Sequence, residues 1–384
     1  MFLWTKVKVY RSETRDGQSA SWFKASAAAT GQLLVFVDAS VVVNHGWIQP
    51  LIAKLVDNDN VVVVPHVDNI LDDDRFFRTD DWLVNVLTWT LSTVYYESPL
   101  RADGYDTLDT PVARGDVLAA KRTFFESIGG FDDRLVPDDG AGTLAELSLR
   151  AWMCGGAVRI ATCSRVAVRN ALRARRVVDP VNYRRVAELW LEDFRGTVYR
   201  QGGVTEELSP SEKQSVSDRR AYISKTVPSG CKSFSWYLSN VATAVLAPSE
   251  NMHQFGKLRA KTMYCVRAAE SGDVDMTLCR QYMYEPATVF ELTVDGAVFR
   301  GDRCLEAGDD GAQVRWRPCD DGSRRQRWRL ESDGRLSVDV QRGRCLAHVS
   351  KRDPTTMDLF HFPELQPCSN REEDVRRQTW TFVE

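Results

Sequence analysis

The stretch Arg303-Cys304-Leu305-Glu306 decides the fold of the last third of this chain, because shorter versions of it occur twice more. Tyr264-Cys265-Val266 lies 39 residues before it, and Arg344-Cys345-Leu346 lies 41 residues after it. Three repeats of about 40 residues, none able to bury its own aromatic residue, are expected to pack around a pseudo-threefold axis. The repeats therefore predict a β-trefoil over residues 258–384.

The ends of the repeats predict the core of this trefoil. The second and third copies end in Gln326-Arg327-Trp328 and Gln378-Thr379-Trp380, and the first has Val289-Phe290 at the equivalent place. A small β core needs a large aromatic residue from each repeat, so we expect these residues to serve the core rather than to contact a sugar.

Sugar binding requires an aromatic face for the apolar side of a pyranose and a carboxylate for its hydroxyls. The second repeat keeps both, as Glu306 and Trp316, whereas Arg267 and Ala347 stand at the acid position of the other two. Glu306, Trp316 and the neighbouring Gln326 are the candidate carbohydrate-binding residues.

The first two-thirds of the chain alternates strand-like and helix-like runs, which is typical of an α/β domain. Apolar runs predict strands at 33–37, 61–64 and 158–162, and the first of them ends in Asp38. Helical spacing predicts helices at 81–96, 123–128, 144–153 and 186–199, followed by a polar stretch at 201–220. We expect the α/β domain to occupy residues 1–246, with a linker at 247–257 before the trefoil.

Composition narrows the functional classes. The 384 residues are 43% hydrophobic and carry a net charge of −3, which excludes extensive disorder and the basic field of a general nucleic-acid binder. No apolar run approaches the roughly 18 residues that cross a bilayer, and the first residues lack a signal-peptide pattern.

The cysteines predict an oxidising compartment. Of the nine, six fall in the trefoil as neighbouring pairs, and no Cys-x-x-Cys spacing suggests zinc. The expected trefoil disulfides are Cys265–Cys279, Cys304–Cys319 and Cys345–Cys368.

These features resemble a known pair of domains. The trefoil resembles ricin-type lectin domains, and the preceding region resembles the polypeptide N-acetylgalactosaminyltransferases, which join a GT-A transferase domain to such a lectin. The resemblance rests on residues 27–38, 44–51 (NHGWIQPL), 144–165 (LAELSLRAWMCGGAVRIATCSR), 186–194 (VAELWLEDF) and 231–240 (CKSFSWYLSN). The family's anchor, stem and first nucleotide-binding strand have no counterpart before Met1, so the expected GT-A domain is incomplete.

The resemblance implies a function and a place. Family members transfer N-acetylgalactosamine (GalNAc) from UDP-GalNAc to Ser or Thr of a polypeptide with Mn²⁺, in the Golgi lumen. The implied partners are a Ser/Thr-containing polypeptide or a GalNAc-glycopeptide. The family pattern also implies a Cys154–Cys231 disulfide and leaves Cys163 over, either because its partner is absent or because it is a buried free thiol.

The family's metal ligands are the test of activity. The family supplies Asp-x-His after a strand and a second His after Cys-Ser-Arg-Val, but the corresponding residues are Asp38, Ser40 and Val168. Asp38 alone is too small a ligand set for a metal centre, and Asp38 could also simply cap the next turn. His45 is a conceivable substitute ligand, although we expect it on a solvated turn.

Other family positions have also changed. The Trp-Gly-Gly-Glu-Asn segment corresponds to residues 140–144, which read Gly-Ala-Gly-Thr-Leu, and Ala20 and Trp22 replace two arginines. Arg114 replaces a glycine, where it could obstruct the site or supply a substitute cation. The acidic residues at 72–74, 132–133 and 138–139 are expected to be solvated loop charges.

Three hypotheses remain at this stage. The chain is an impaired or inactive GalNAc-transferase-like protein, or a glycan- or glycopeptide-binding lectin on a non-catalytic scaffold. In the third hypothesis it is a fragment whose nucleotide site lies in a missing N-terminal part.

Overall fold

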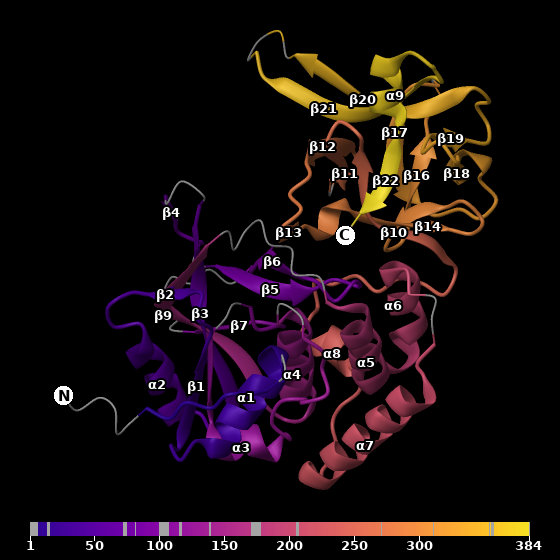
Figure 1. The fold of residues 1–384 in the computed structure, drawn as a ribbon. Coiled ribbons are helices and arrows are strands. Elements are labelled where there is room, and N and C mark those ends of the chain that lie inside the picture. Colours follow the sequence, from indigo (N-terminus) through magenta and orange to yellow (C-terminus); the bar gives the residue numbers. More distant parts are fainter. Residues whose placement is uncertain are drawn as a thin grey trace. The chain divides into compact units, whose positions relative to one another are not determined.

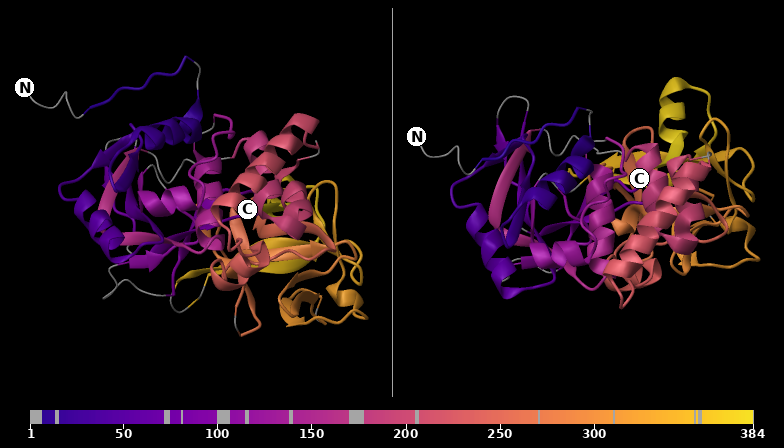
Figure 2. Two further views of the ribbon diagram at one scale, coloured as in Figure 1. Left: turned by 90° about the horizontal axis from the view of Figure 1, so that it is seen from below. Right: turned by 60° about the horizontal axis from the view of Figure 1, so that its bottom comes forward.

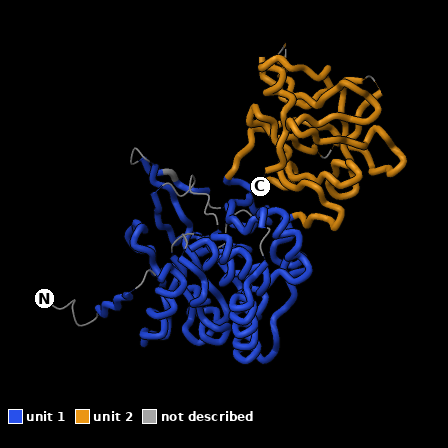
Figure 3. Tube along the Cα trace, turned by 45° about the vertical axis from the view of Figure 1, so that its right-hand side comes forward, with its two compact units in different colours: residues 1–245, 282–284 blue, residues 246–281, 285–384 orange. Residues whose placement is uncertain are grey.

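The computed structural model describes residues 7–13, 16–71, 75–80, 82–99, 107–114, 117–137, 140–169, 178–204, 207–269, 271–309, 311–352, 354 and 357–383. The chain forms two compact units, residues 1–245 with 282–284 and residues 246–281 with 285–384 (Figure 3). Among the described residues, no helix is both long and apolar enough to cross a membrane.

Unit 1 is an α/β unit with a seven-stranded sheet in the order β1-β8-β3-β9-β2, to which β4 and β7 add at β3 and β9 (Figure 1). The strands of this unit are β1 (Leu33–Val37), β2 (Val41–Val43), β3 (Val61–Ile70), β4 (Phe76–Phe77), β5 (Leu83–Leu87), β6 (Thr93–Glu97), β7 (Thr107–Asp109), β8 (Val117–Lys121), β9 (Ala157–Arg169) and β13 (Met283–Tyr284). Strands β13, β6 and β5 form a separate small sheet.

The helices of unit 1 cover both faces of the large sheet. They are α1 (Gly17–Ala28), α2 (Ile48–Asp57), α3 (Arg122–Ser127), α4 (Ala141–Met153), α5 (Pro180–Trp190), η1 (Glu192–Phe194), α6 (Arg195–Gly202), α7 (Pro210–Thr226) and α8 (Phe234–Asn240). One apolar cluster joins α1, α3 and α4 to one face, and a second joins α2 to the other face. Figure 2 shows the ribbon from two further sides. The alternation of side chains along each strand feeds both clusters.

Unit 2 consists of short antiparallel strands. Its elements are β10 (Met252–Ala260), β11 (Tyr264–Ala268), β12 (Val274–Leu278), η2 (Pro286–Thr288), β14 (Val289–Thr293), β15 (Val298–Arg300), β16 (Arg303–Ala307), β17 (Val314–Pro318), η3 (Arg324–Gln326), β18 (Trp328–Leu330), β19 (Leu336–Val338), β20 (Arg344–Arg352), β21 (Leu359–Pro367), α9 (Glu372–Gln378) and β22 (Trp380–Val383). Phe290, Trp328 and Trp380, one from each repeat, are buried in one core cluster, as expected.

The predicted helix at 81–96 is wrong. This segment forms the antiparallel hairpin of β5 and β6, in which Val84 lies opposite Tyr96 and Val86 lies opposite Val94. β-Branched and aromatic side chains favour a pleated surface, and here this preference outweighs the helix-like spacing of the apolar residues.

Helix boundaries after residue 180 also differ from the prediction. The single helix expected at 186–199 is two helices, α5 and α6, separated by η1, where Glu192 has a positive φ of 43°. The polar stretch at 201–220 ends in helix α7, which begins with a capping box between Ser209 and Glu212 and has Pro210 at its first position.

Two predicted strands, β3 and β9, run further than expected, and β9 continues to Arg169. β3 continues through Pro65 to Ile70, with a register shift at Pro65 where the strand pairs with β9. The expected linker at 247–257 ends in structure, because β10 begins at Met252 and pairs with β14 and β22.

Candidate functional site

Three strands of unit 1 have their carboxyl ends along the same border of the sheet, which is called the sheet edge below. β1 and β3 are each antiparallel to β8, and β3 is parallel to β9, so β1, β3 and β9 point the same way. In open α/β sheets ligands lie beyond the carboxyl ends of such strands. Asp38 follows β1 at this edge, and Val168 lies near the end of β9.

Asp38 makes a local contact within its own turn. Its Oδ1 accepts a hydrogen bond from the backbone N–H of Ser40 at 2.8 Å, and Ser40 itself is exposed. This is the turn-capping arrangement that a short carboxylate side chain provides. One oxygen of Asp38 is therefore engaged with the backbone.

Val168 belongs to the apolar core. It is 8% exposed, lies opposite Val41 of β2 and Asn69 of β3, and packs in the cluster beneath α2. The structure thus brings Asp38, Ser40 and Val168 to the same edge, but as one carboxylate, one hydroxyl and one aliphatic side chain. This donor set does not fit Mn²⁺, which requires several oxygen or nitrogen ligands.

No other metal cluster takes its place in the part of the chain that is described. His45 lies on an exposed turn before Gly46, and no group of three or more His, Cys, Asp or Glu side chains is arranged to hold an ion among the described residues.

Two further positions that differ from the family pattern, Arg114 and Gly140, lie close to neighbouring side chains. The Arg114 guanidinium lies 4.1 Å from the centre of the Tyr95 ring, a cation–π contact. Gly140 precedes α4 with a φ of 86°, and a Cβ there would come within 2.1 Å of Oε1 of Gln18. The positive φ favours glycine here, whereas the Gln18 amide is the end of a flexible side chain that can move aside.

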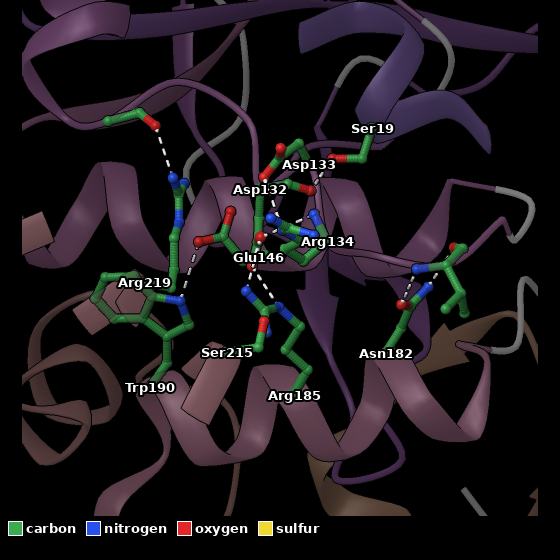
Figure 4. A network of polar contacts seen from close by, with 12 residues as sticks. Ser19, Asp132, Asp133, Arg134, Glu146, Asn182, Arg185, Trp190, Ser215 and Arg219 are labelled. Atoms are coloured by element: carbon green, nitrogen blue, oxygen red, sulfur yellow. Dashed lines mark hydrogen bonds and ion pairs between the residues drawn. The ribbon is translucent and has the colours of Figure 1, made fainter. Parts of the chain in front are cut away.

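A network of buried charges involves α4, α5 and Asp132, and it was not predicted from the sequence. Asp132 was expected to be a solvated loop charge, but it is fully buried, and this prediction is wrong. Arg185 of α5 donates to both of its carboxylate oxygens, at 2.7 and 2.9 Å, as Figure 4 shows. Burial raises the pKa of Asp132, but the hydrogen bonds and charge of Arg185 outweigh it and hold the pKa below its usual value.

A second buried pair stands beside the first. Arg150 donates to both oxygens of Glu146 within α4, and Nε1 of Trp190 donates to the same carboxylate at 3.2 Å. Asp132 and Arg185 are 53 residues apart, so no local sequence signal could have revealed their pairing, whereas Glu146 and Arg150 have the i,i+4 spacing of helix neighbours. The acidic residues at 72–74 and 138–139 lie outside the described residues.

In unit 2, Glu306 has a defined orientation. Nε2 of Gln326, which is 1% exposed, donates to Oε2 of Glu306 at 2.8 Å and to the carbonyl of Pro318 at 3.0 Å. Oε1 of Gln326 accepts from the N–H of Asp320. Gln326 is therefore a positioning residue for a half-buried carboxylate on β16.

Trp316 does not lie where the prediction put it. It is 2% exposed, stacks on Phe290 with ring centres 4.9 Å apart, and belongs to the trefoil core. The prediction that Trp316 stacks on a sugar is wrong, because its ring faces inward. The period of two along β17 was the missed signal: Val314 and Trp316 point inward, while Arg315 and Arg317 are exposed.

The third repeat provides an internal comparison. Nε2 of Gln378 donates to the carbonyl of Pro367 and Oε1 accepts from the N–H of Ser369, just as Gln326 bonds its own repeat. Ala347 stands where the second repeat has Glu306. The trefoil therefore forms this glutamine arrangement without the acid, which frees Glu306 for a role other than folding.

Each unit contains at least one internal disulfide. The bonded pairs are Cys154–Cys231, Cys265–Cys279, Cys304–Cys319 and Cys345–Cys368. Cys163 is a free and exposed thiol, so the alternative of a buried thiol is wrong.

Comparison with known families assigns a class to each unit. Residues 3–120 match the model of glycosyl transferase family 2, and residues 254–380 match the ricin-type β-trefoil lectin domain. The chain is thus a GT-A-like α/β domain followed by a lectin domain.

Individual relatives point to one family. Probable N-acetylgalactosaminyltransferase 9 of Caenorhabditis elegans is 24% identical over 99% of this chain and 66% of its own length. Polypeptide N-acetylgalactosaminyltransferase 15 of Homo sapiens is 28% identical over 98% and 59%. Polypeptide N-acetylgalactosaminyltransferase 13 of Homo sapiens is 30% identical over 78% and 55%. The chain spans between 55% and 66% of the length of these relatives.

A solved structure agrees in fold. The crystal structure of GalNAc-T7 with UDP, GalNAc and Mn²⁺ matches with a TM-score of 0.57 and 22% identity, covering 99% of this chain and 71% of that one. The relatives that this chain resembles in sequence are thus polypeptide N-acetylgalactosaminyltransferases, and the solved structure shows the same fold.

Proposed function

We propose that this chain binds GalNAc-bearing polypeptides through the second trefoil repeat, and that its α/β unit does not carry out Mn²⁺-dependent transfer. One observation carries the second part. At the two positions where the family has histidine ligands, Ser40 is exposed and Val168 lies in the apolar core, while Asp38 caps a turn.

The trefoil supplies the chemistry of binding. The Glu306 carboxylate accepts hydrogen bonds from sugar hydroxyls, and Arg315, directly opposite on β17 and exposed, can donate to an oxygen of the same sugar. Gln326 holds Glu306 in place through a hydrogen bond. A carboxylate that is already fixed loses little conformational freedom when a sugar binds, which favours binding.

Transfer of GalNAc from UDP-GalNAc to a Ser or Thr hydroxyl is the second candidate. It is supported by the match of residues 3–120 to glycosyl transferase family 2 and by Asp38, which remains at the end of β1. This candidate requires a metal site that the described side chains at this edge do not form.

The same resemblance supports a location in the secretory pathway, with the Golgi lumen as the proposed compartment. The four disulfides agree with an oxidising environment.

Isothermal titration separates the two candidates. We expect no heat from UDP, with or without Mn²⁺, and a measurable heat from methyl α-N-acetylgalactosaminide. The Glu306→Ala variant should lose the protection from hydrogen exchange that this sugar gives to β16 and β17, whereas Asp339→Ala, at another exposed carboxylate of the trefoil, should keep it. UDP binding that depends on Mn²⁺ would overturn the second part of the proposal, and protection of β16 and β17 that survives in Glu306→Ala would overturn the first.

A further inference from the structure

Unit 1 contains a pocket of about 520 Å³ that involves none of the residues discussed at the sheet edge. It is lined by α1, by α5, by α7 and by the segment after the Gly129-Gly130 turn. Its volume falls in the range of pockets that hold small organic ligands. We call it the α1–α7 pocket.

Two aromatic side chains line this pocket from different helices. Phe23 of α1 is 37% exposed and Tyr222 of α7 is 47% exposed, so each ring presents part of its surface at the pocket. Both pack on the same turn: a Cβ at Gly129 would lie 3.2 Å from the Tyr222 ring, and one at Gly130 would lie 3.9 Å from Phe23. The two glycines therefore leave the space that the rings occupy.

Arg219 of α7 holds this turn through hydrogen bonds to its backbone carbonyls. Its terminal nitrogens donate to the carbonyls of Gly129 and Gly130 at 3.0 and 3.2 Å, and its guanidinium lies 5.5 Å from the centre of the Tyr222 ring. Arg219 is 8% exposed, and its Nε is buried without a hydrogen-bond partner.

Further polar groups line the pocket. Arg185 bridges Asp132 to the hydroxyl of Ser215, to which it donates at 3.0 Å, so this hydroxyl keeps its own proton for donation (Figure 4). Along α7, Nε2 of Gln214 donates to Oδ1 of Asp218 at 2.8 Å, and the carboxylate has capacity for more hydrogen bonds.

The charges of the lining balance. Its three arginines are Arg134, Arg185 and Arg219, and its three aspartates are Asp132, Asp133 and Asp218. A balanced lining does not select a phosphate or a cation. Aromatic rings beside planar carboxylate, amide and guanidinium groups instead match a neutral ligand with an apolar face and several hydroxyl groups.

We propose that the α1–α7 pocket binds a neutral saccharide residue, with its apolar face on Phe23 or Tyr222 and its hydroxyls on Asp218, Gln214 and Ser215. The site is separate from Glu306 and goes beyond the proposed function, since it requires neither transfer nor the trefoil. The chain would then hold a glycan at a second point.

The test uses the full chain with Glu306→Ala, so that the trefoil site does not contribute. Methyl α-N-acetylgalactosaminide and methyl α-glucoside are titrated by calorimetry, and protection from hydrogen exchange is mapped in parallel. We expect binding of at least one sugar, with new protection in residues 17–28 and 210–226. Adding Phe23→Ala and Tyr222→Ala should weaken this binding by about tenfold or more.

A matched pair of variants controls for nonspecific effects. Gln214→Trp fills the pocket and should abolish binding, while Lys213→Trp, exposed on the same helix but outside the lining, should leave it unchanged. Absence of binding by both sugars overturns the proposal, as does binding that protects only the trefoil or that survives in Gln214→Trp. Displacement of the sugar by an unglycosylated Ser/Thr peptide would identify a peptide groove and would also overturn it.

Discussion

Gln326 and Gln378 hold the same place in two repeats, but only one of them touches an acid. Both amides bond a proline carbonyl and a backbone N–H, while Gln326 alone also donates to Glu306. The shared bonds belong to the fold, and the additional bond belongs to the site. Comparison of repeats within one chain thus separates structure from function at single residues.

This difference predicts unequal effects of one substitution. Gln326→Ala and Gln378→Ala should each destabilise the trefoil by about 1–3 kcal/mol, because each leaves buried backbone groups without partners. Only Gln326→Ala should also weaken binding of methyl α-N-acetylgalactosaminide, since Glu306 then loses its orientation. Urea unfolding and calorimetry measure the two effects, and equal sugar affinity in both variants would show that Gln326 does not position Glu306.

Arg185 and Asp132 form a pair whose removal should be costly. Arg185→Leu leaves the Asp132 carboxylate buried without its bidentate partner, so we expect a loss of about 3–5 kcal/mol in the free energy of unfolding. Arg134→Ala, which removes an exposed partner 4.0 Å from Asp133, should cost less than about 1 kcal/mol. Denaturant unfolding of both variants checks this, and similar losses would contradict the role given to the buried pair.

At the scale of elements, the β20–β21 hairpin contains a small imidazole cluster. His348 and His361 share a hydrogen bond of 2.9 Å, the Tyr264 ring stacks on His361, and Thr262 bonds Nδ1 of His348 at 2.7 Å. Burial, then the neighbouring His361 and Arg377, lower the pKa of His348 to about 4, and burial lowers that of His361. Both imidazoles are therefore neutral in the folded hairpin near neutral pH.

This cluster makes the trefoil sensitive to acid. The unfolded chain takes up a proton on His348 near pH 6.5, whereas the folded chain does so only near pH 4, so stability is complete above about 6.5 and declines as the pH falls toward 4. Melting temperatures between pH 7 and 4 should decline less in His348→Gln than in the unchanged chain. His253→Gln, at an exposed histidine, should follow the unchanged chain, and an identical decline in His348→Gln would exclude this cluster as the cause.

Elements with a strong local signal were predictable, and those decided by tertiary contacts were not. The run at 33–37 and the short helix before Gly129 are found where they were expected, as β1 and α3. The hairpin at 83–97 was missed because its apolar spacing also fits a helix. Helix α7 was missed because only Val216, Arg219 and Ile223 are buried on it, and one of these is an arginine.

The same difference between local signals and tertiary contacts applies to the residues of the candidate sites. The family resemblance implied that Asp38, Ser40 and Val168 occupy the positions of one metal site, so their proximity was expected without coordinates. The burial of Trp316 and Asp132 depends on partners far along the chain, Phe290 for the one and Arg185 for the other. Such partners cannot be assigned from one sequence, because the pairing is set by the packing of whole elements.

At the scale of the whole molecule, the disulfides are distributed unequally. Unit 2 contains three, which close loops of 14, 15 and 23 residues, whereas unit 1 contains one, between cysteines 77 residues apart. Loop-closure entropy gives each trefoil disulfide about 3 kcal/mol and the longer one about 4.5 kcal/mol. The trefoil, with short strands and a small core, therefore depends on covalent links more than the α/β unit does.

Calorimetry of the intact chain should accordingly resolve two transitions that respond differently to reductant. We expect dithiothreitol to lower or abolish the transition of the trefoil and to lower that of the α/β unit by a smaller amount. The Cys154→Ala/Cys231→Ala variant assigns the peaks, because it removes the only disulfide found within the described part of unit 1 and should shift that transition alone. A single transition that responds to reductant as one cooperative unit would show instead that the two units unfold together.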